Sequence, residues 1–183
     1  MDHAARRREL AAAVWRVIAR DGVAEVSIRT VAAESGWSSG ALRHYFATRG
    51  ELLAFACEQV TTRVTERIQR LAPTGTPARQ VSAVLAEAMP LDAERRIEAS
   101  ISFSFLALGL SDPALAEVQR QQFAALYELC EHLAAQLTPG GERVARRLHA
   151  LVDGLSVQLL AGHLEPAAAL AELDAYLDEL AAG

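Results

Sequence analysis

SIRTVAAESGWSSGALRHYF, residues 27–46, is the stretch that decides the fold of this chain. It begins with Ser27, a residue type that commonly caps helix N-termini. Its apolar residues then recur at i, i+3 and i+4, namely Ile28, Val31 and Ala32. Gly36 tolerates the left-handed backbone conformation with which helices often end. The first half of the stretch therefore predicts a short helix with one buried face.

The second half of the stretch predicts another short helix. Ser38 is suited to cap it, and Leu42 and Phe46, four residues apart, lie on its inward side. The residues left facing outward are Ser39, Arg43 and His44. Two short helices joined by a tight glycine turn have the spacing of a helix-turn-helix motif, whose second helix enters the major groove of DNA.

The remainder of the sequence predicts an all-α fold. Its apolar residues are mainly Ala and Leu, with few aromatic residues and few β-branched runs, which favours helix nearly throughout. About nine helices are expected, over residues 6–21, 27–36, 38–46, 49–71, 78–88, 92–110, 113–137, 142–161 and 166–180. The first is expected to brace the two short helices with an inward stripe of Leu10, Val14, Val17 and Ile18.

The net charge of −5 argues, for the chain as a whole, against a nucleic-acid binder. The charge is unevenly divided, however. Residues 1–50 hold eight Arg and five acidic residues, whereas the remainder holds ten Arg and eighteen acidic residues. A positive N-terminal part on an acidic body is typical of a protein with one end built to meet phosphate. Three arginines near the start, Arg6, Arg7 and Arg8, either reach flanking phosphates or are solvated at a frayed terminus.

Composition also limits the location and chemistry of the protein. With 51% hydrophobic residues, the chain can bury a sizeable core in one domain or two small ones. No run of about 18 apolar residues and no signal-peptide pattern is present, so we expect a cytoplasmic protein without a membrane span. Cys57 and Cys130 lie inside helical patterns without metal-ligand spacing, and buried thiols are favoured over a redox switch. No metal or cofactor is expected.

No catalytic motif is apparent in the sequence. It lacks the phosphate-binding loop and the His-Glu-x-x-His zinc motif. His149 and Asp153 lie at i and i+4, where they could form a metal or acid–base pair, but a contact on a helix surface is favoured. We therefore expect that the protein is not an enzyme and has no catalytic residues.

Residues 10–53, LAAAVWRVIARDGVAEVSIRTVAAESGWSSGALRHYFATRGELL, resemble the DNA-binding head of the TetR family of bacterial repressors. The match comprises a helix ending in Asp-Gly, then Ser-x-Arg-x-Val-Ala, Gly-x-Ser-x-Gly-x-Leu, Tyr-Phe, and a basic residue leading into Glu-Leu-Leu. Residues 89–123 and 152–162 resemble the C-terminal domain of a subgroup that includes choline- and betaine-responsive repressors. The resemblance implies a DNA-binding domain over 1–47 and an effector-binding and dimerisation domain over 48–183. It also implies an Ω-shaped homodimer that leaves a palindromic operator when a small effector binds.

The resemblance assigns DNA contacts to the head. Arg29 lies where the family often has a side chain that contacts bases or phosphate, and the alternative is a solvated arginine at a helix start. Gly40 would allow close approach, Ala41 could touch a thymine methyl group, and Arg49 would anchor phosphate. The residues expected at the DNA are Ser27, Arg29, Ser38, Ser39, Gly40, Ala41, Arg43, His44, Tyr45 and Arg49.

Two positions depart from the family pattern. Position 43 is commonly aromatic, whereas Arg43 could read a guanine edge. Position 37 is usually a small β-branched residue, whereas Trp37 either packs under the turn or lies against the sugar–phosphate backbone. The operator sequence of a relative should therefore not be transferred to this protein.

The last two long helices predict how the subunits pair. Their apolar stripes are wider than one neighbouring helix needs, which favours a four-helix bundle with the same two helices of a second subunit. Gly154 would permit a close crossing, and the alternative is an ordinary core within one subunit. The residues expected at the interface are Leu148, Leu151, Val152, Leu155, Leu159, Leu173, Tyr176 and Leu177.

An effector pocket is expected among the helices between residues 49 and 137. The expected lining residues are Phe55, Met89, Glu98, Ile101, Ser102, Phe105, Phe123 and Tyr127. Each is also consistent with plain core, and the serines of SISFSF, residues 100–105, can instead bond to carbonyls of their own helix. A mostly apolar wall without a dense aromatic cage favours a lipophilic or aromatic effector over choline or betaine.

Two functions are left open by the sequence. The favoured one is a repressor that binds a palindromic operator as a homodimer and is released by a small effector. The alternative is a DNA-binding protein without a small-molecule effector, which acts through a protein partner or organises the nucleoid.

Overall fold

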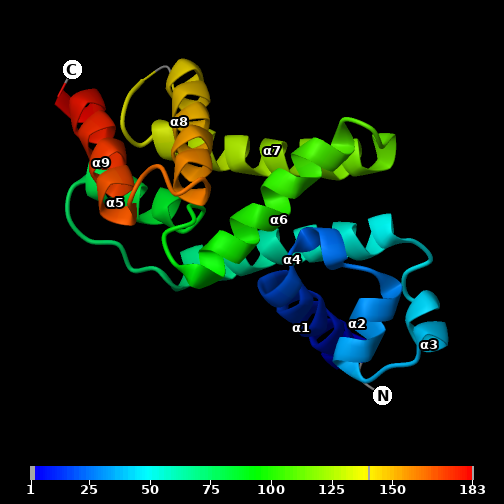
Figure 1. Cartoon of the computed structure of the whole chain (residues 1–183). Coiled ribbons are helices and arrows are strands. Elements are labelled where there is room, and N and C mark those ends of the chain that lie inside the picture. Colours follow the sequence, from blue (N-terminus) through cyan, green and yellow to red (C-terminus); the bar gives the residue numbers. More distant parts are fainter. Residues whose placement is uncertain (1–2, 140, 183) are drawn as a thin grey trace. The chain divides into compact units, whose positions relative to one another are not determined.

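The protein is all-α, as predicted. The computed structural model describes residues 3–139 and 141–182 (Figure 1). Within these residues there are nine α-helices, one short 3-10 helix and no strand. They run in the order α1 (His3–Asp21), η1 (Val23–Glu25), α2 (Ile28–Ser35), α3 (Ser39–Arg43), α4 (Arg49–Arg70), α5 (Pro77–Ala86), α6 (Ala93–Gly109), α7 (Pro113–Ala134), α8 (Glu142–Leu160) and α9 (Pro166–Ala182). None of the described helices is long and apolar enough to cross a membrane.

Most helices begin where the sequence supplies a cap. The Thr76 side chain accepts a hydrogen bond from the backbone N–H of Arg79 at the start of α5, and Pro77 occupies the first helical position. Asp92 accepts from the backbone N–H of Arg95 at 2.8 Å and so begins α6. This bond lowers the pKa of the Asp92 carboxyl below its usual value.

Several details of the secondary structure differ from the prediction; for example, α3 ends at Arg43, whereas the helix was predicted to reach residue 46. η1 follows Gly22, whose φ of 87° lies in the left-handed region, and this short turn was not predicted. α7 ends at Ala134, whereas the helix was predicted to reach residue 137. The backbone N–H groups of Leu137 and Thr138 both bond to the Ala134 carbonyl, at 3.0 and 3.1 Å, so the chain tightens into a turn there.

Contacts divide the chain into two compact units. The first comprises the chain up to Thr62 together with Ser100–Gln119, and the second comprises Arg63–Ala99 and the chain from Arg120 onward. The predicted boundary between residues 47 and 48 falls at the N-cap of α4, where Thr48 accepts from the backbone N–H of Glu51 at 3.1 Å. That boundary stays a prediction.

Each unit has its own core. In the first unit α1 contacts α2, and α2 contacts α3. The inward stripe of α1 is buried, which confirms the predicted brace: Leu10, Val14, Val17 and Ile18. In the second unit α5, α7, α8 and α9 bury their apolar faces against one another. Its fully buried members include Val81, Leu85, Leu148, Leu159, Leu173 and Leu177.

Candidate DNA-binding surface

α2 is fixed at both ends by the residues that the sequence singled out. The Ser27 hydroxyl accepts from the backbone N–H of Thr30 at 3.1 Å, and the Thr30 hydroxyl accepts from the backbone N–H of Ser27 at 2.9 Å. This capping box satisfies donors that the first turn leaves free, and a cap of this kind contributes about 1 kcal/mol. Gly36 ends the helix with φ 72° and ψ 12°, and its N–H bonds to the Ala32 carbonyl. The predicted cap and the predicted glycine stop are both confirmed.

α3 is too short to be stable alone, since it spans five residues. The Ser38 hydroxyl caps it by accepting from the backbone N–H of Ala41 at 3.1 Å. Leu42 and Phe46 are buried, and the Phe46 ring lies 5.1 Å from that of Phe55 on α4. Packing of its inward side and a cap at its N-terminus therefore stabilise the helix. The residues on its outward side are not needed for the core.

The residues on the outward side of α3 contribute little to the packing of the subunit. Arg43 and His44 are exposed, whereas Ser39 and Ala41 are half-buried. A Cβ built on Gly40 would meet only the Ser38 hydroxyl oxygen, at 3.9 Å, so no part of the described structure requires glycine at this position. Glycine in a helix costs about 1 kcal/mol relative to alanine, and that cost is not offset within the subunit.

The remaining predicted DNA contacts lie on the neighbouring elements. Arg29 is exposed in the first turn of α2. Ser27 is half-buried and Ser38 exposed, and the hydroxyl of each is engaged in capping. Tyr45, directly after α3, is half-buried. All of the predicted contact residues except Arg49 therefore lie on α2, on α3 or at their ends. The predicted phosphate contacts of Arg7 and Arg8 fall on side chains outside the described ones.

Arg49 has a structural task that the sequence did not reveal. Its guanidinium donates to the carbonyl oxygens of Val26 at 2.8 Å, Val23 at 3.1 Å and Ala24 at 3.3 Å. The first residue of α4 is thereby tied to η1 and to the segment that enters α2. Its predicted phosphate contact stays a prediction. The partners lie more than twenty residues earlier in the chain, so helix periodicity carries no signal for them.

Trp37, Tyr45 and Arg6 form a cluster beside α3. The rings of Trp37 and Tyr45 meet edge to face, with centroids 5.4 Å apart and an interplanar angle of 74°. The Arg6 guanidinium carbon lies 5.9 Å from the centroid of the Trp37 ring, and Arg6 Nη1 donates to the Tyr45 hydroxyl at 3.5 Å. Trp37 is half-buried, so it neither sits fully under the turn nor extends freely into solvent. The spacing of these residues in the sequence did not predict that Arg6 lies beside Trp37 and Tyr45.

A second set of contacts holds α1 against α2. Glu34 accepts from Arg16 Nε at 2.6 Å and from Arg20 Nη1 at 2.8 Å. These two guanidinium groups hold the pKa of the Glu34 carboxyl below its usual range. The pairs are exposed, so they orient the helices more than they stabilise them.

In the second unit, the predicted dimer residues are mostly occupied within the subunit. Six of the eight are buried in the unit's own core: Leu148, Val152, Leu155, Leu159, Leu173 and Leu177. Leu151 and Tyr176 are half-buried and pack against that core. The apolar stripes of α8 and α9 therefore pack within the same chain.

The predicted effector residues other than Glu98 fall into three groups. Four are buried apolar core residues: Phe55, Met89, Ile101 and Phe105. Ser102 is half-buried, whereas the neighbouring Ser104 donates to the Ser100 carbonyl at 2.7 Å, which is the back-bonding alternative. Phe123 and Tyr127 are half-buried on α7.

Glu98 is the one acidic residue of the predicted effector set, and it is satisfied within the protein. It is buried, and its two oxygens accept from Arg67 at 2.8 and 2.5 Å. Arg63 Nε lies 3.3 Å from the same carboxylate. Arg67 also donates to the Glu87 carboxylate, at 2.9 Å. The carboxylate of Glu98 therefore clamps α4 to α6 and is not left over for an effector.

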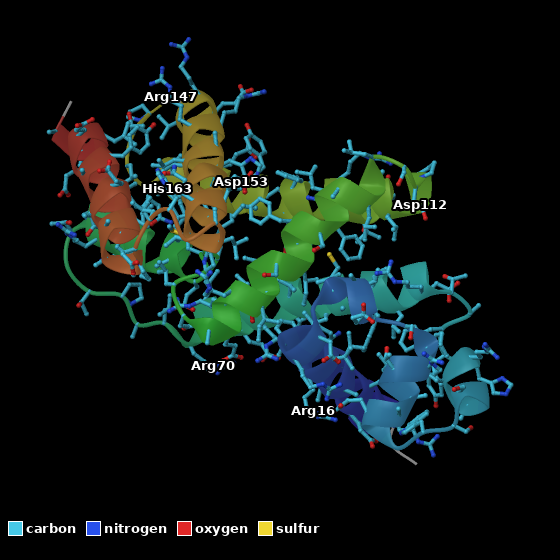
Figure 2. All side chains as sticks on the ribbon, viewed as in Figure 1. Arg16, Arg70, Asp112, Arg147, Asp153 and His163 are labelled. Atoms are coloured by element: carbon cyan, nitrogen blue, oxygen red, sulfur yellow. The ribbon has the colours of Figure 1, made fainter. Side chains whose placement is uncertain are left out.

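A histidine on α8 meets the two half-buried aromatic residues of α7. The rings of Phe123 and Tyr127 lie edge-on to the His149 ring, with centroids 5.4 and 6.2 Å away. His149 Nε2 lies 3.7 Å from an Asp153 oxygen, and Asp153 is labelled in Figure 2. Burial raises the pKa of the Asp153 carboxyl, and also raises that of the buried Cys130 thiol to about 12. Such a thiol stays protonated, so it is a poor nucleophile.

These features define a DNA-binding regulator: a capped helix-turn-helix with a bare outward face, joined to a separate helical body. Residues 10–55 match the family model described as bacterial regulatory proteins, tetR family. Residues 77–182 match the model described as BetI-type transcriptional repressor, C-terminal. The chain belongs to the TetR family of transcriptional regulators. Since both families consist of regulators, the prediction that the protein is not an enzyme is confirmed.

Known proteins agree with this assignment. The chain is similar to the HTH-type transcriptional regulator PksA of Bacillus subtilis (strain 168), with 36% identity over 87% of this chain and 81% of the relative. A transcriptional regulator from Rhodococcus sp. Rha1 has the same fold, with a TM-score of 0.83, 30% identity and 95% of each chain covered. The multidrug binding protein EbrR in complex with ethidium matches with a TM-score of 0.75 and 26% identity, over 96% of this chain and 98% of that chain.

Proposed function

We propose that this regulator binds a palindromic operator as a homodimer in the cytoplasm and leaves it when a small lipophilic or aromatic effector binds the helical body. The observation that carries the DNA-binding part is the outward face of α3. Arg43 and His44 are exposed there, and the unexplained Gly40 leaves room for another molecule to approach the backbone. Arg43 can donate two hydrogen bonds to a guanine edge, and Ala41 can contact a thymine methyl group.

The exposed faces of α8 and α9 support pairing of two subunits. Exposed residues of α8 and its C-cap recur with alternating spacings of four and three: Arg143, Arg147, Ala150, Gly154, Val157 and the C-cap residue Ala161. Exposed residues of α9 recur in the same way: Ala168, Ala171, Ala175, Asp178 and Ala182. This is the spacing with which one helix presents a continuous seam to another, and small residues along it allow close packing. The arginines on α8 supply positive charge, and Asp178 on α9, which also pairs with Arg79 of its own subunit at 3.3 Å, supplies negative charge.

Gly154 supports the same seam independently. It is exposed within α8, and a Cβ built on it would meet nothing within 4 Å. A glycine inside a helix costs about 1 kcal/mol relative to alanine, and nothing in the subunit requires it. A second helix that crosses α8 close to residue 154 would account for the glycine. Val157, one turn further along and 48% exposed, would be buried by the same crossing.

The effector part of the proposal rests on unsatisfied groups and on the neighbours. Gln119 is 9% exposed, and its side-chain oxygen has no hydrogen-bond partner among the described residues, although such a group usually finds one. In the second unit, Phe123, Tyr127 and His149 form a half-buried aromatic group. EbrR, whose solved complexes include ethidium, imidazole and proflavin, takes aromatic ligands. An aromatic effector fits the half-buried aromatic group of the second unit, and the Gln119 oxygen is a separate acceptor in the first.

α4 is the element through which an effector could act on the reading head. At its first residue, Arg49 holds three carbonyls of the segment that leads into α2. Near its end, Arg67 holds Glu98 and Glu87. An effector that binds one arrangement of α4 more tightly than another would shift α2 and α3 through the Arg49 contacts.

Footprinting tests this proposal. The protein is applied to its own upstream region, with and without a panel of aromatic and lipophilic metabolites, at a stated salt concentration. Protection of a palindrome that one compound abolishes is the expected result. Protection that no compound disturbs would argue for the alternative function, and binding to no palindrome on the upstream region or in a genome-wide site search would contradict the proposal.

One observation favours the alternative, a regulator that acts through a protein partner. Leu106 and Leu110 of the α6 region are 44% and 85% exposed, and Ala107 beside them is also exposed. Exposed apolar residues gathered on one helix face often mark a protein contact. Substitution of Leu110 by Ser should leave both DNA binding and effector release intact if the favoured function holds.

A further inference from the structure

We propose that Arg6, Trp37 and Tyr45 form a phosphate-binding site that holds one strand of duplex DNA beside the recognition helix. We call these three residues the Arg6 cluster. The inference rests on the proposed DNA-binding function and extends it, because it names a contact that fixes the position of α3 without reading bases. The family pattern does not contain it, since position 37 is a small residue in most members.

The location of the cluster ties it to α3. Trp37 lies two residues before the first residue of α3, and Tyr45 lies two residues after the last. Their rings meet at 5.4 Å, so the two flanks of the recognition helix touch each other. Arg6, from the first turns of α1, joins them through its contact with the Trp37 ring and its bond to the Tyr45 hydroxyl. Three separate segments of the head thus converge at one place.

The chemistry of the cluster favours an anion. An arginine side chain carries only donors, an indole carries one N–H donor, and a phenol can donate its O–H. No described residue accepts a hydrogen bond from the Trp37 indole N–H. A phosphate oxygen is the acceptor that DNA presents most often, and Arg forms strong charge-assisted bonds to it.

Each contact within the Arg6 cluster is weak compared with the packing of a buried core. An exposed cation–π contact contributes about 0.5–1 kcal/mol, and an aromatic pair a similar amount. A bond of 3.5 Å between Arg6 and Tyr45 is at the limit of hydrogen-bond geometry. The Arg6–Tyr45 bond can therefore be exchanged for a bond to a phosphate oxygen while the ring contact keeps Arg6 beside Trp37.

Binding measurements on full-length variants test the site. Arg6→Gln is expected to weaken binding roughly tenfold on the operator and on a scrambled duplex alike, and to reduce the slope of log affinity against log salt by about 1. Trp37→Phe keeps the ring but removes the N–H, and should weaken both duplexes by a similar factor without changing the slope. Arg70→Gln, an exposed arginine at the end of α4, is the matched control and should behave as wild type.

The two failures can be told apart. If the wild type prefers no palindrome and Arg43→Ala changes nothing, the proposed function fails. A different result would overturn the inference alone. In that case the wild type prefers a palindrome and Arg43→Ala binds its operator less well, but Arg6→Gln and Trp37→Phe bind like the wild type. The contacts of the Arg6 cluster would then serve packing only. A variant that changes the preference of operator over scrambled DNA also overturns the inference, because phosphate contacts carry no sequence information.

Fluorescence gives a second readout that does not depend on losing affinity. The chain has two tryptophans, and Trp15 is buried in α1. In Trp15→Phe, emission comes from Trp37 alone and should change on adding either duplex at low salt, and return when salt releases the DNA. An emission spectrum that DNA leaves unchanged would overturn the inference.

Discussion

The recognition helix α3 and the long helix α8 show two different relations between sequence pattern and partner. In α3 the inward residues Leu42 and Phe46 are buried and the outward face has no task in the subunit. In α8 the apolar stripe was predicted to meet a second subunit, yet it is buried in its own. An apolar stripe therefore predicts burial but does not say which chain provides it. A residue indicates an outside partner when it lowers the stability of its own helix and no contact within the subunit offsets that loss. Gly40 and Gly154 are such residues.

The largest effect should come from the inward face of α8. Leu148 is 0% exposed in the core of the second unit, so Leu148→Ala should lower the free energy of unfolding by about 2–5 kcal/mol. Because the residue is buried within one subunit, the loss should not depend on protein concentration. Denaturant titrations at two concentrations measure it, with the exposed Leu106→Ala as control. A loss confined to low concentration would instead assign Leu148 to the dimer interface.

The outward face of α3 should respond in the opposite way. Arg43 is exposed, so Arg43→Ala should leave the unfolding free energy within about 0.5 kcal/mol of the wild type. If Arg43 reads a base, operator affinity should fall by about 1–3 kcal/mol while affinity for scrambled DNA changes less. Fluorescence anisotropy with both duplexes measures this. Equal losses on both would make Arg43 a phosphate contact.

The outward face of α8 sharpens the comparison further. Gly154→Leu should leave each subunit folded, since the added side chain meets only open space. In the dimer it should block the close crossing and raise the dissociation constant at least about tenfold, which corresponds to about 1.4 kcal/mol. Sedimentation equilibrium reports the change, and Ala124→Leu on the exposed side of α7 is the control. Unchanged dimerisation in Gly154→Leu would move the interface elsewhere.

The smallest effect concerns the pH dependence of stability. Burial raises the pKa of Asp153, so the folded chain holds this proton more tightly than the unfolded chain does. The stability that the protonated form supplies is complete below the ordinary pKa of about 4 and is lost as pH rises through the raised pKa. Asp153→Asn should therefore melt slightly higher than the wild type at pH 7, and the difference should vanish below about pH 4. A lower melting temperature at pH 7 would mean that the contact with His149 outweighs burial.

The sequence predicted local structure well because local rules decide it. Ser27, Gly36 and Ser38 carry their caps and turns within four residues of themselves, so their roles could be inferred from spacing alone. The helix order follows equally from glycine, proline and apolar period. η1 was missed because three residues give no period to detect.

What could not be predicted depends on contacts between distant residues. The partners of Arg49 and the meeting of Arg6 with Trp37 join segments more than twenty residues apart. The sequence suggested that Glu98 is available to a ligand. In the structure, however, Glu98 accepts a hydrogen bond from Arg67, thirty-one residues earlier. The DNA contacts, the dimer interface and the effector pocket need a bound partner to be observed, so their residues stay predictions.

Substitution of Gly40 tests most directly whether the outward face of α3 binds DNA. Gly40→Ala should raise the free energy of unfolding by up to about 1 kcal/mol, because alanine favours helix and its Cβ meets no protein atom closer than 3.9 Å. The same methyl group should weaken operator binding, since it occupies the space through which DNA would approach. A more stable protein that binds its operator less well is the predicted result. A more stable protein with unchanged affinity would contradict the account, because α3 would then not approach DNA at Gly40.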